Sequence, residues 1–235
     1  MRIAIIPARG GSKRIPRKNI KVFRGKPMIC WPIAAALEAG LFDEVIVSTD
    51  DDEIARIAEE AGALVPFRRP AALADDLAPT RDAIIHAIAD AETRHDRTVG
   101  MACCIYATAA MLSADDLNRG FEMLADRRKI SFVFAATGYG HPVHRALMRR
   151  ETGGVRMITP EYARTRTQDL PEAFHDAGMF YWGRRDAFMA DEPMFSPRAL
   201  PCMIPRSRAQ DIDTPEDWDL AETLFDRLSR TEMPA

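Results

Sequence analysis

Residues 3–19 read Ile3-Ala4-Ile5-Ile6-Pro7-Ala8-Arg9-Gly10-Gly11-Ser12-Lys13-Arg14-Ile15-Pro16-Arg17-Lys18-Asn19. The apolar run predicts a buried strand that ends at a proline, and a loop of small residues and cations follows it. Nine of the first 26 residues are Lys or Arg and none is Asp or Glu, although the whole chain has a net charge of −3. The paired glycines allow backbone N–H groups to approach an anion closely. We therefore expect a phosphate site here, with Lys13, Arg14 and Lys18 supplying positive charge.

Two familiar phosphate-binding loops are absent from this stretch. It contains neither the G-x-x-x-x-G-K-[ST] of a P-loop nor the G-x-G-x-x-G of a dinucleotide-binding fold. The alternative to a phosphate site is that the cations form a solvated surface or contact nucleic acid. Because the positive charge is confined to one segment of a slightly acidic chain, the pattern favours a local anion site.

Length and composition are those of an ordinary globular protein. The 235 residues are 47% hydrophobic and 29% charged, which predicts one domain, residues 1–235, with ample core. No apolar run approaches the roughly 20 residues that span a bilayer, and Pro7 and Arg9 interrupt any signal-peptide pattern. We expect a cytoplasmic protein without membrane or nucleic-acid partners. The four cysteines form no C-x-x-C pair, which favours small core residues over zinc or redox chemistry.

Strands and helices alternate along most of the chain. The apolar pattern predicts strands over residues 3–6, 45–49, 63–66, 99–106, 130–136, 177–182 and 200–205. Helices are predicted to open at Pro27, in the acidic run 50–53, at Arg184 and after the capping residues Thr80, Ser113 and Thr214. This alternation predicts an α/β fold, with a mostly parallel sheet, helices on both faces and residues 99–106 at the centre.

Residues 138–174 break the alternation. Gly, Pro, Arg and His are frequent there and the apolar periodicity fades. The segment predicts an inserted arm or subdomain, with an antiparallel hairpin around Glu151-Thr152-Gly153-Gly154. Because a thinly apolar projection needs a partner surface, we expect it to serve in a homodimer.

Two acids near the C-terminus are candidate metal ligands. Asp211 and Asp213 stand at i and i+2 in an extended segment, so their side chains point to the same side. Two carboxylates in front of a polyphosphate suit Mg²⁺, which accepts carboxylate, water and phosphate oxygens. The alternative is that Asp213 only helps to cap the helix that begins after Thr214.

Other polar residues allow both a structural and a functional interpretation. Asp50 follows a strand at the sheet edge where α/β proteins bind ligands, but helix capping explains it equally well. The pair His175-Asp176 would orient a polar substrate or serve the structure alone. No nucleophilic triad is legible from local spacing, whereas phosphoryl chemistry needs mainly positioning and charge stabilisation.

Several of these stretches together resemble the sugar cytidylyltransferases, the family that includes the CMP-sialic acid synthetases. The resemblance rests on Ala8 to Asn19 and continues through Val47-Ser48-Thr49-Asp50, Arg69-Pro70 and Asp211-Ile212-Asp213-Thr214-Pro215-Glu216-Asp217. It spans almost the whole chain, and linked motifs in one order are more specific than any single motif. It implies a Rossmann-like nucleotidyltransferase fold with a dimerisation arm, in agreement with the pattern of residues 138–174.

Two stretches narrow the resemblance to the branch that uses pseudaminic acid. They are Cys103-Cys104-Ile105-Tyr106-Ala107-Thr108-Ala109 and Gln168-Asp169-Leu170-Pro171-Glu172-Ala173-Phe174-His175-Asp176-Ala177-Gly178. The sialic and legionaminic acid branches usually carry Gln-Pro-Thr-Ser-Pro in place of Tyr106 to Ala110, and Ala110 replaces a proline expected in either branch. Legionaminic and N-acetylneuraminic acid are the alternative substrates. A non-catalytic module that binds nucleotide or nucleic acid is the alternative from another class.

The resemblance implies a reaction and a set of roles. CTP and a nine-carbon α-keto acid sugar would give CMP-sugar and pyrophosphate, with attack by the anomeric hydroxyl and dependence on Mg²⁺. The nucleotide-binding residues would be Ala8, Arg9, Gly10, Gly11, Ser12, Lys13, Asn19, Arg69 and Thr108. The sugar-binding residues would be Tyr106, Gln168, His175 and Asp176. Asp211 and Asp213 would bind the metal, and Arg9, Lys13, Lys18 and Asp213 would act in catalysis.

Overall fold

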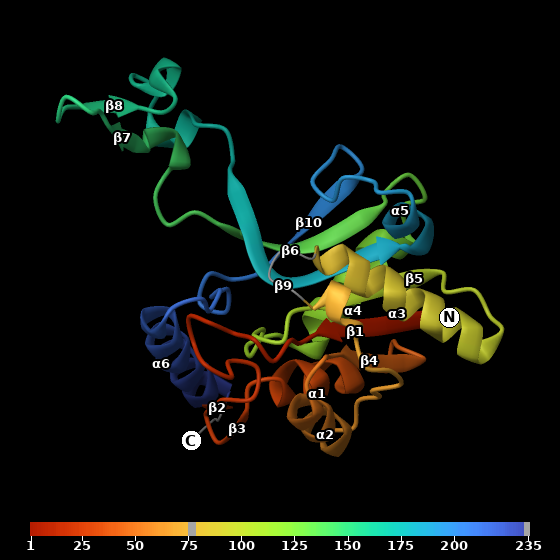
Figure 1. Ribbon diagram of the computed structural model, residues 1–235. Coiled ribbons are helices and arrows are strands. Elements are labelled where there is room, and N and C mark those ends of the chain that lie inside the picture. The colour runs from red at the N-terminus through yellow and green to blue at the C-terminus, as the bar shows by residue number, and fades with distance from the viewer. Residues whose placement is uncertain (75–78, 233–235) are drawn as a thin grey trace.

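A mostly parallel sheet forms the centre of the protein. The computed structural model describes residues 1–74 and 79–232, and within them one sheet contains six strands in the order β10-β6-β9-β5-β1-β4 (Figure 1). The strands are β1 (Arg2–Pro7), β4 (Glu44–Ser48), β5 (Met101–Ile105), β6 (Phe132–Gly138), β9 (Phe174–Arg184) and β10 (Ala199–Met203). Only β9 runs antiparallel to its neighbours in this sheet. The predicted α/β class and the interior position of residues 99–106 are confirmed.

Helices cover both faces of the sheet. On one face, α1 (Cys30–Glu38), α2 (Asp52–Glu60) and α4 (Ala114–Ala125) pack on Ala4, Ile6 and Cys103. On the other, α3 (Thr80–His95) and α5 (Arg185–Met189) pack on Ile3, Ile5 and Cys104. Alternate residues of one strand therefore bury opposite faces, as the period of a strand requires. Cys103, Cys104 and Cys202 are buried free thiols, as expected for core residues.

A third apolar cluster joins the start of the chain to its end. The C-terminal helix α6 (Pro215–Glu232) packs beside a hairpin of β2 (Val22–Phe23) and β3 (Lys26–Pro27). The cluster is built around two buried isoleucines, Ile15 from the basic loop and Ile212 from the carboxylate segment, together with Phe23, Met28, Ala110, Trp218 and Ala221. Burial of these side chains is what brings two segments almost 200 residues apart in sequence to one place.

Three local predictions were wrong. Pro27 lies in β3 because Arg24 and Gly25, with φ of 45° and 90°, make the tight hairpin turn before it. Residues 63–66 form an isolated bridge in which Leu64 alone pairs with β4. Pro66 lacks an N–H and cannot extend that ladder. Thr80 is the first residue of α3, and Pro79 occupies its cap position.

The predicted capping residues at two other helices are confirmed. The side chain of Ser113 accepts from the N–H of Asp116, and the Asp116 carboxylate accepts from the N–H of Ser113, which is a capping box at α4. At α6, Thr214 and Asp217 make the same reciprocal pair. Capping residues are legible in sequence because each supplies a side-chain oxygen to otherwise unpaired N–H groups.

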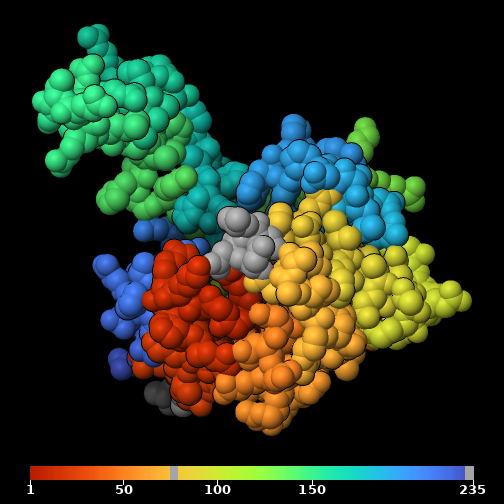
Figure 2. Space-filling view, in the orientation of Figure 1, coloured from red at the N-terminus to blue at the C-terminus, as the bar shows by residue number. Residues whose placement is uncertain are grey.

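Residues 139–173 stand clear of the body of the protein (Figures 1 and 2). They contain an antiparallel hairpin of β7 (Leu147–Arg149) and β8 (Val155–Met157), joined by a turn in which Gly153 has φ of 89°. Short 3₁₀ turns occur at η2 (Val143–Arg145), η3 (Pro160–Tyr162) and η4 (Thr167–Asp169), whereas η1 (Ala71–Leu73) lies in the body. The hairpin exposes Leu147 and Val155 to 60% and 64%.

The crossing of β9 over the core sets a sharp steric requirement at Gly183. A Cβ there would lie 2.4 Å from the ring of Phe188 and 2.7 Å from that of Phe132. We expect Gly183→Ala to lower the free energy of unfolding by about 1–3 kcal/mol, the usual effect of overpacking. Urea unfolding followed by circular dichroism measures it. Gly154→Ala, where a Cβ would meet open space, is the matched control, and an equal loss in both variants would contradict this account of the core.

Candidate active site

A cleft of about 610 Å³ opens where β1, β4 and β5 end, the edge at which α/β sheets bind ligands. Its walls come from the basic loop, the turn after β5, the start of α3 and the segment after β10. The lining residues are Pro7, Arg9, Ser12, Lys13, Arg14, Lys18, Asn19, Arg69, Leu73, Pro79, Thr80, Ala83, Tyr106, Ala107, Thr108 and Asp213. The structure therefore brings together most of the predicted nucleotide-binding residues and all four predicted catalytic residues.

The basic loop is fixed against the start of α2. The N–H of Gly10 donates to Oδ1 of Asp50 at 3.1 Å, and Arg17 pairs with Asp51, which is the N-cap of α2. A Cβ on Gly10 would lie 2.6 Å from Oδ2 of Asp51, so this position requires glycine. Asp51 therefore provides the helix cap, so capping does not explain Asp50, whose carboxylate holds the basic loop.

A hydrogen bond across the basic loop joins its two ends. Asn19 is nearly buried and donates through Nδ2 to the carbonyl oxygen of Arg9 at 3.0 Å. This bond closes the loop on itself, while Ala8 is buried beneath it. Gly11 faces open space. Asn19 and Ala8 thus shape the loop that presents Arg9, Ser12 and Lys13 to the cleft.

The two halves of the site meet at Asp213. Its Oδ1 lies 2.8 Å from Nη2 of Arg14 and 3.3 Å from Nζ of Lys18. Lys18 also donates to the carbonyl oxygen of Ile212 at 2.6 Å. The cap of α6 is formed by Thr214 and Asp217, and the Asp217 carboxylate also accepts the backbone N–H of Asp213 at 3.1 Å. Asp213 thus directs its side chain to the basic loop, and the capping alternative is wrong.

Asp211 and Asp213 share a second cleft of about 620 Å³. Partial removal from water and the nearby charge of Asp213 both raise the pKa of the Asp211 carboxyl. Close to Asp211, β9 bends at Gly178 (φ 61°), where a Cβ would lie 3.4 Å from Cγ of Asp211. In the described chain no group of three or more His, Cys, Asp or Glu side chains has a metal-binding arrangement. Two neighbouring carboxylates beside a cleft lined by cations nevertheless fit Mg²⁺, which takes few protein ligands and several phosphate or water oxygens.

Arg69 lies under the floor of the cleft. Its Nε donates to Oγ of Ser48 at 3.0 Å, and its Nη2 donates to the Ser48 carbonyl. Burial lowers the pKa of this guanidinium, and the charge of Asp50 opposes that effect. Arg69 therefore ties the end of β4 to the cleft and places a positive charge at its floor.

The predicted sugar-binding residues do not gather at one point. Tyr106 lines the first cleft, and its ring packs 5.2 Å from that of Tyr181. The hydroxyl of Tyr181 donates to Asp176 at 2.5 Å. His175 points to the other face of β9, toward the second cleft. Gln168 lies on the arm, in the turn Thr167–Asp169, and lines none of these clefts.

Tyr181 and Thr80 border these cavities, although the sequence marked neither of them as a candidate site residue. Tyr181 lies within an apolar strand, a pattern that predicts a core residue. Its burial raises the pKa of the hydroxyl. Tyr106, Asp176 and Tyr181 border a further cavity of about 330 Å³ with apolar walls that include Phe195.

Among the described residues, no helix combines the length and apolarity needed to cross a membrane.

Comparison with known proteins connects this geometry to one group. The family model described as Cytidylyltransferase matches residues 3–210. Pseudaminic acid cytidylyltransferase from Campylobacter jejuni is 41% identical over 95% of both chains. CMP-N,N'-diacetyllegionaminic acid synthase from Legionella pneumophila is 28% identical over 95% of this chain and 96% of its own. A solved CMP:2-keto-3-deoxy-manno-octonic acid synthetase in complex with CTP shares the fold, with a TM-score of 0.70, 17% identity, and coverage of 97% and 99%.

Proposed function

This chain belongs to the cytidylyltransferase family, and from that membership we propose that it transfers CMP from CTP to pseudaminic acid. The products are CMP-pseudaminic acid and pyrophosphate. The observation that carries the proposal is the 41% identity to a pseudaminic acid cytidylyltransferase along 95% of the chain. A cleft that joins a cationic loop to Asp213 supports it, with Asp211 in the adjoining second cleft, because cations beside carboxylates suit a nucleoside triphosphate.

In this proposal the basic loop binds the triphosphate. Lys13, Lys18 and Arg9 line the cleft from one side and the start of α3 faces it from the other. Cations and helix N-termini both attract phosphate. Thr108 and Arg69, from the turn after β5 and the loop after β4, hold the nucleotide against the end of the sheet.

The reaction is an in-line displacement at the α-phosphorus. The oxygen of the sugar's anomeric hydroxyl forms the new P–O bond and its proton passes to water. The bond between the α-phosphorus and the oxygen that bridges it to the β-phosphorus breaks, and pyrophosphate leaves with that electron pair. Lys13, Lys18 and Arg9 stabilise the negative charge that develops on phosphate oxygens. Mg²⁺ bound by Asp211 and Asp213 would neutralise further phosphate charge. Because the metal carboxylates and the cations meet at Asp213, the transferring phosphorus belongs between them.

Pseudaminic acid is the acceptor that the sequence favours over two alternatives. Residues Tyr106 to Ala110 stand where the other branches carry Gln-Pro-Thr-Ser-Pro, and identity to the legionaminic acid relative is lower, 28% against 41%. Tyr106, Asp176 and the apolar cavity beside them offer hydrogen bonds and an apolar wall to the sugar.

A three-way acceptor assay tests the choice of sugar. We expect the purified protein with CTP and Mg²⁺ to give its highest kcat/KM with pseudaminic acid, measured by release of pyrophosphate. Legionaminic and N-acetylneuraminic acid serve as the paired acceptors. A higher kcat/KM with either of them would contradict the assignment, and release of pyrophosphate without any sugar would identify a hydrolase instead.

We also propose that two chains associate through the arm and that the protein works in the cytoplasm. Exposed Leu147, Met148 and Val155 on the hairpin offer an apolar surface for the second chain. Association would bring Gln168 of one arm to a neighbouring body. Light scattering after gel filtration measures the mass: about twice 26.3 kDa supports the dimer, and a monomeric mass contradicts it.

A further inference from the structure

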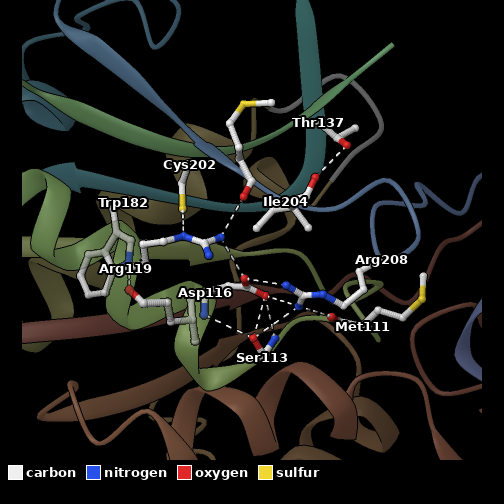
Figure 3. A network of polar contacts seen from close by, with 11 residues as sticks. Met111, Ser113, Asp116, Arg119, Thr137, Trp182, Cys202, Ile204 and Arg208 are labelled. Atoms are coloured by element: carbon white, nitrogen blue, oxygen red, sulfur yellow. Dashed lines mark hydrogen bonds and ion pairs between the residues drawn. The ribbon is translucent and has the colours of Figure 1, made fainter. Parts of the chain in front are cut away.

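A network of charged side chains surrounds the buried carboxylate of Asp116 at the start of α4 (Figure 3). The Asp116 side chain is only 1% exposed and receives both outer nitrogens of Arg208, with Nη2 2.9 Å from Oδ1. The hydroxyl of Ser113 donates to the same carboxylate at 2.8 Å, and Nη2 of Arg119 donates at 3.1 Å. Although burial opposes ionisation, the hydrogen bonds from Arg208 and Ser113 hold the pKa of Asp116 below its ordinary value.

The two arginines reach the same carboxylate from different parts of the chain. Arg119 comes from α4 and binds the end of β10, donating to Sγ of Cys202 at 3.2 Å and to the carbonyl of Met203 at 2.9 Å. Arg208 comes from the segment after β10, three residues before Asp211. Its Nη1 also donates to the carbonyl of Met111 at 3.3 Å. Arg208 therefore links the carboxylate segment to the turn that carries Tyr106 and Thr108.

The segment between β10 and α6 is fixed at three points. At its start, the N–H of Ile204 bonds to Ala136 at 2.7 Å and the Thr137 hydroxyl bonds to the Ile204 carbonyl at 2.8 Å. Near its end, Ile212 is buried between the two aspartates. Between these anchors, Arg208 inserts its side chain toward α4 with an exposed fraction of 18%.

A buried ion pair adds little to the free energy of unfolding, because the cost of removing both charges from water offsets most of their attraction. It does fix geometry, since the planar guanidinium binds a carboxylate through two parallel hydrogen bonds. We propose that Arg208, seated on Asp116, is a positioning residue that sets the Asp211/Asp213 pair against the nucleotide-binding turn. This inference rests on the proposed metal role of that pair.

Binding of Mn²⁺ to the protein with CTP but without sugar, followed by electron paramagnetic resonance, tests the inference independently of turnover. We expect Arg208→Met to weaken Mn²⁺ binding by about 10-fold to 100-fold, the usual effect of removing a group that orients metal ligands. Arg208→Lys restores only part of the affinity, because an ammonium cannot bond Asp116 and Met111 in the same fork. CTP affinity measured without metal changes much less.

Two further variants separate positioning from folding. Arg119→Met removes the other arginine from Asp116 but leaves the segment 204–213 tied to the turn, so we expect Mn²⁺ affinity within about twofold of wild type. The double variant Asp116→Leu with Arg208→Met replaces the ion pair by apolar groups, which avoids leaving one buried charge unpaired. We expect it to melt below the wild-type temperature, because Asp116 also belongs to the capping box of α4, but to stay folded at the assay temperature and still to bind Mn²⁺ weakly.

Four results would overturn the inference. One is wild-type Mn²⁺ affinity in a folded Arg208→Met protein. Another is an equal loss in Arg119→Met, which would mean that the end of β10 does the positioning. The third is recovery of Mn²⁺ affinity in the double variant, which would reduce Arg208 to neutralising a buried charge. Asp213→Asn belongs in the same titration: if it leaves Mn²⁺ binding intact, the proposed metal site fails and the inference fails with it.

Discussion

Replacing Lys13 by alanine should lower kcat for CMP-sugar formation by about 100-fold to 1,000-fold, the typical effect of removing one group that stabilises transition-state charge. Lys13 lines the cleft on the loop fixed by Asp50 and Asp51. Its ammonium is expected to interact most strongly when negative charge builds up on the phosphates, so the loss should fall mainly on kcat rather than on KM. Steady-state kinetics with CTP and pseudaminic acid separate the two parameters.

Lys26→Ala is the matched control for Lys13→Ala. Lys26 belongs to the same basic stretch, but its ammonium lies 3.7 Å from the ring centre of Trp31, on the hairpin beside α6. We expect its removal to change kcat by no more than about twofold. If Lys13→Ala retained wild-type kcat, or if both variants lost activity equally, the loop would be a general basic surface and its proposed role would be refuted.

Asp213→Asn should lower kcat by at least about 100-fold and raise the Mg²⁺ concentration needed for half-maximal rate. The amide keeps the shape of the side chain but removes the charge that faces Arg14 and Lys18. Two effects combine, since the metal loses a carboxylate and the cationic loop loses its partner. A titration of rate against Mg²⁺ at saturating CTP measures both.

Asp219→Asn is the control on the neighbouring helix. Asp219 is exposed on α6, and its backbone carbonyl accepts the hydroxyl of Thr223. Neutralising it removes the same charge near the site without touching the cleft, and we expect a wild-type Mg²⁺ dependence. An unchanged Mg²⁺ titration in Asp213→Asn would contradict the assignment of this carboxylate, whatever the effect on rate.

Local periodicity and capping residues were enough to predict a mostly parallel sheet and the six stretches of sequence that form its strands. Ile3 to Ile6 alternate between the two faces, and Ser113 and Thr214 open helices where side-chain oxygens meet free N–H groups. The hairpin turn at Arg24 and Gly25 was not predicted, because a non-glycine residue with positive φ has no clear sequence pattern. A strand over residues 63–66 was predicted wrongly, because this edge segment next to Pro66 pairs with β4 only at Leu64.

The candidate site divides in the same way between local and long-range information. The basic loop is one continuous stretch of sequence, so its residues could be predicted together from their own order. The contact of Lys18 with Asp213 joins residues 195 positions apart, and only the burial of Ile15 and Ile212 in one cluster explains it. Tyr181 and Arg208 were missed because a tyrosine in an apolar strand and an arginine in a loop have no local pattern. Their roles come from partners supplied by the fold.

One labelling experiment tests the central chemical claim most directly. The protein is incubated with CTP, Mg²⁺ and pseudaminic acid in H₂¹⁸O, after the anomeric hydroxyl of the sugar has exchanged with that water, and the products are followed by ³¹P NMR. We expect pyrophosphate without ¹⁸O, and CMP-pseudaminic acid whose phosphorus signal carries the isotope shift of one bridging ¹⁸O. Unlabelled CMP-sugar, or labelled CMP in place of CMP-sugar, would contradict attack of the anomeric hydroxyl on the α-phosphorus.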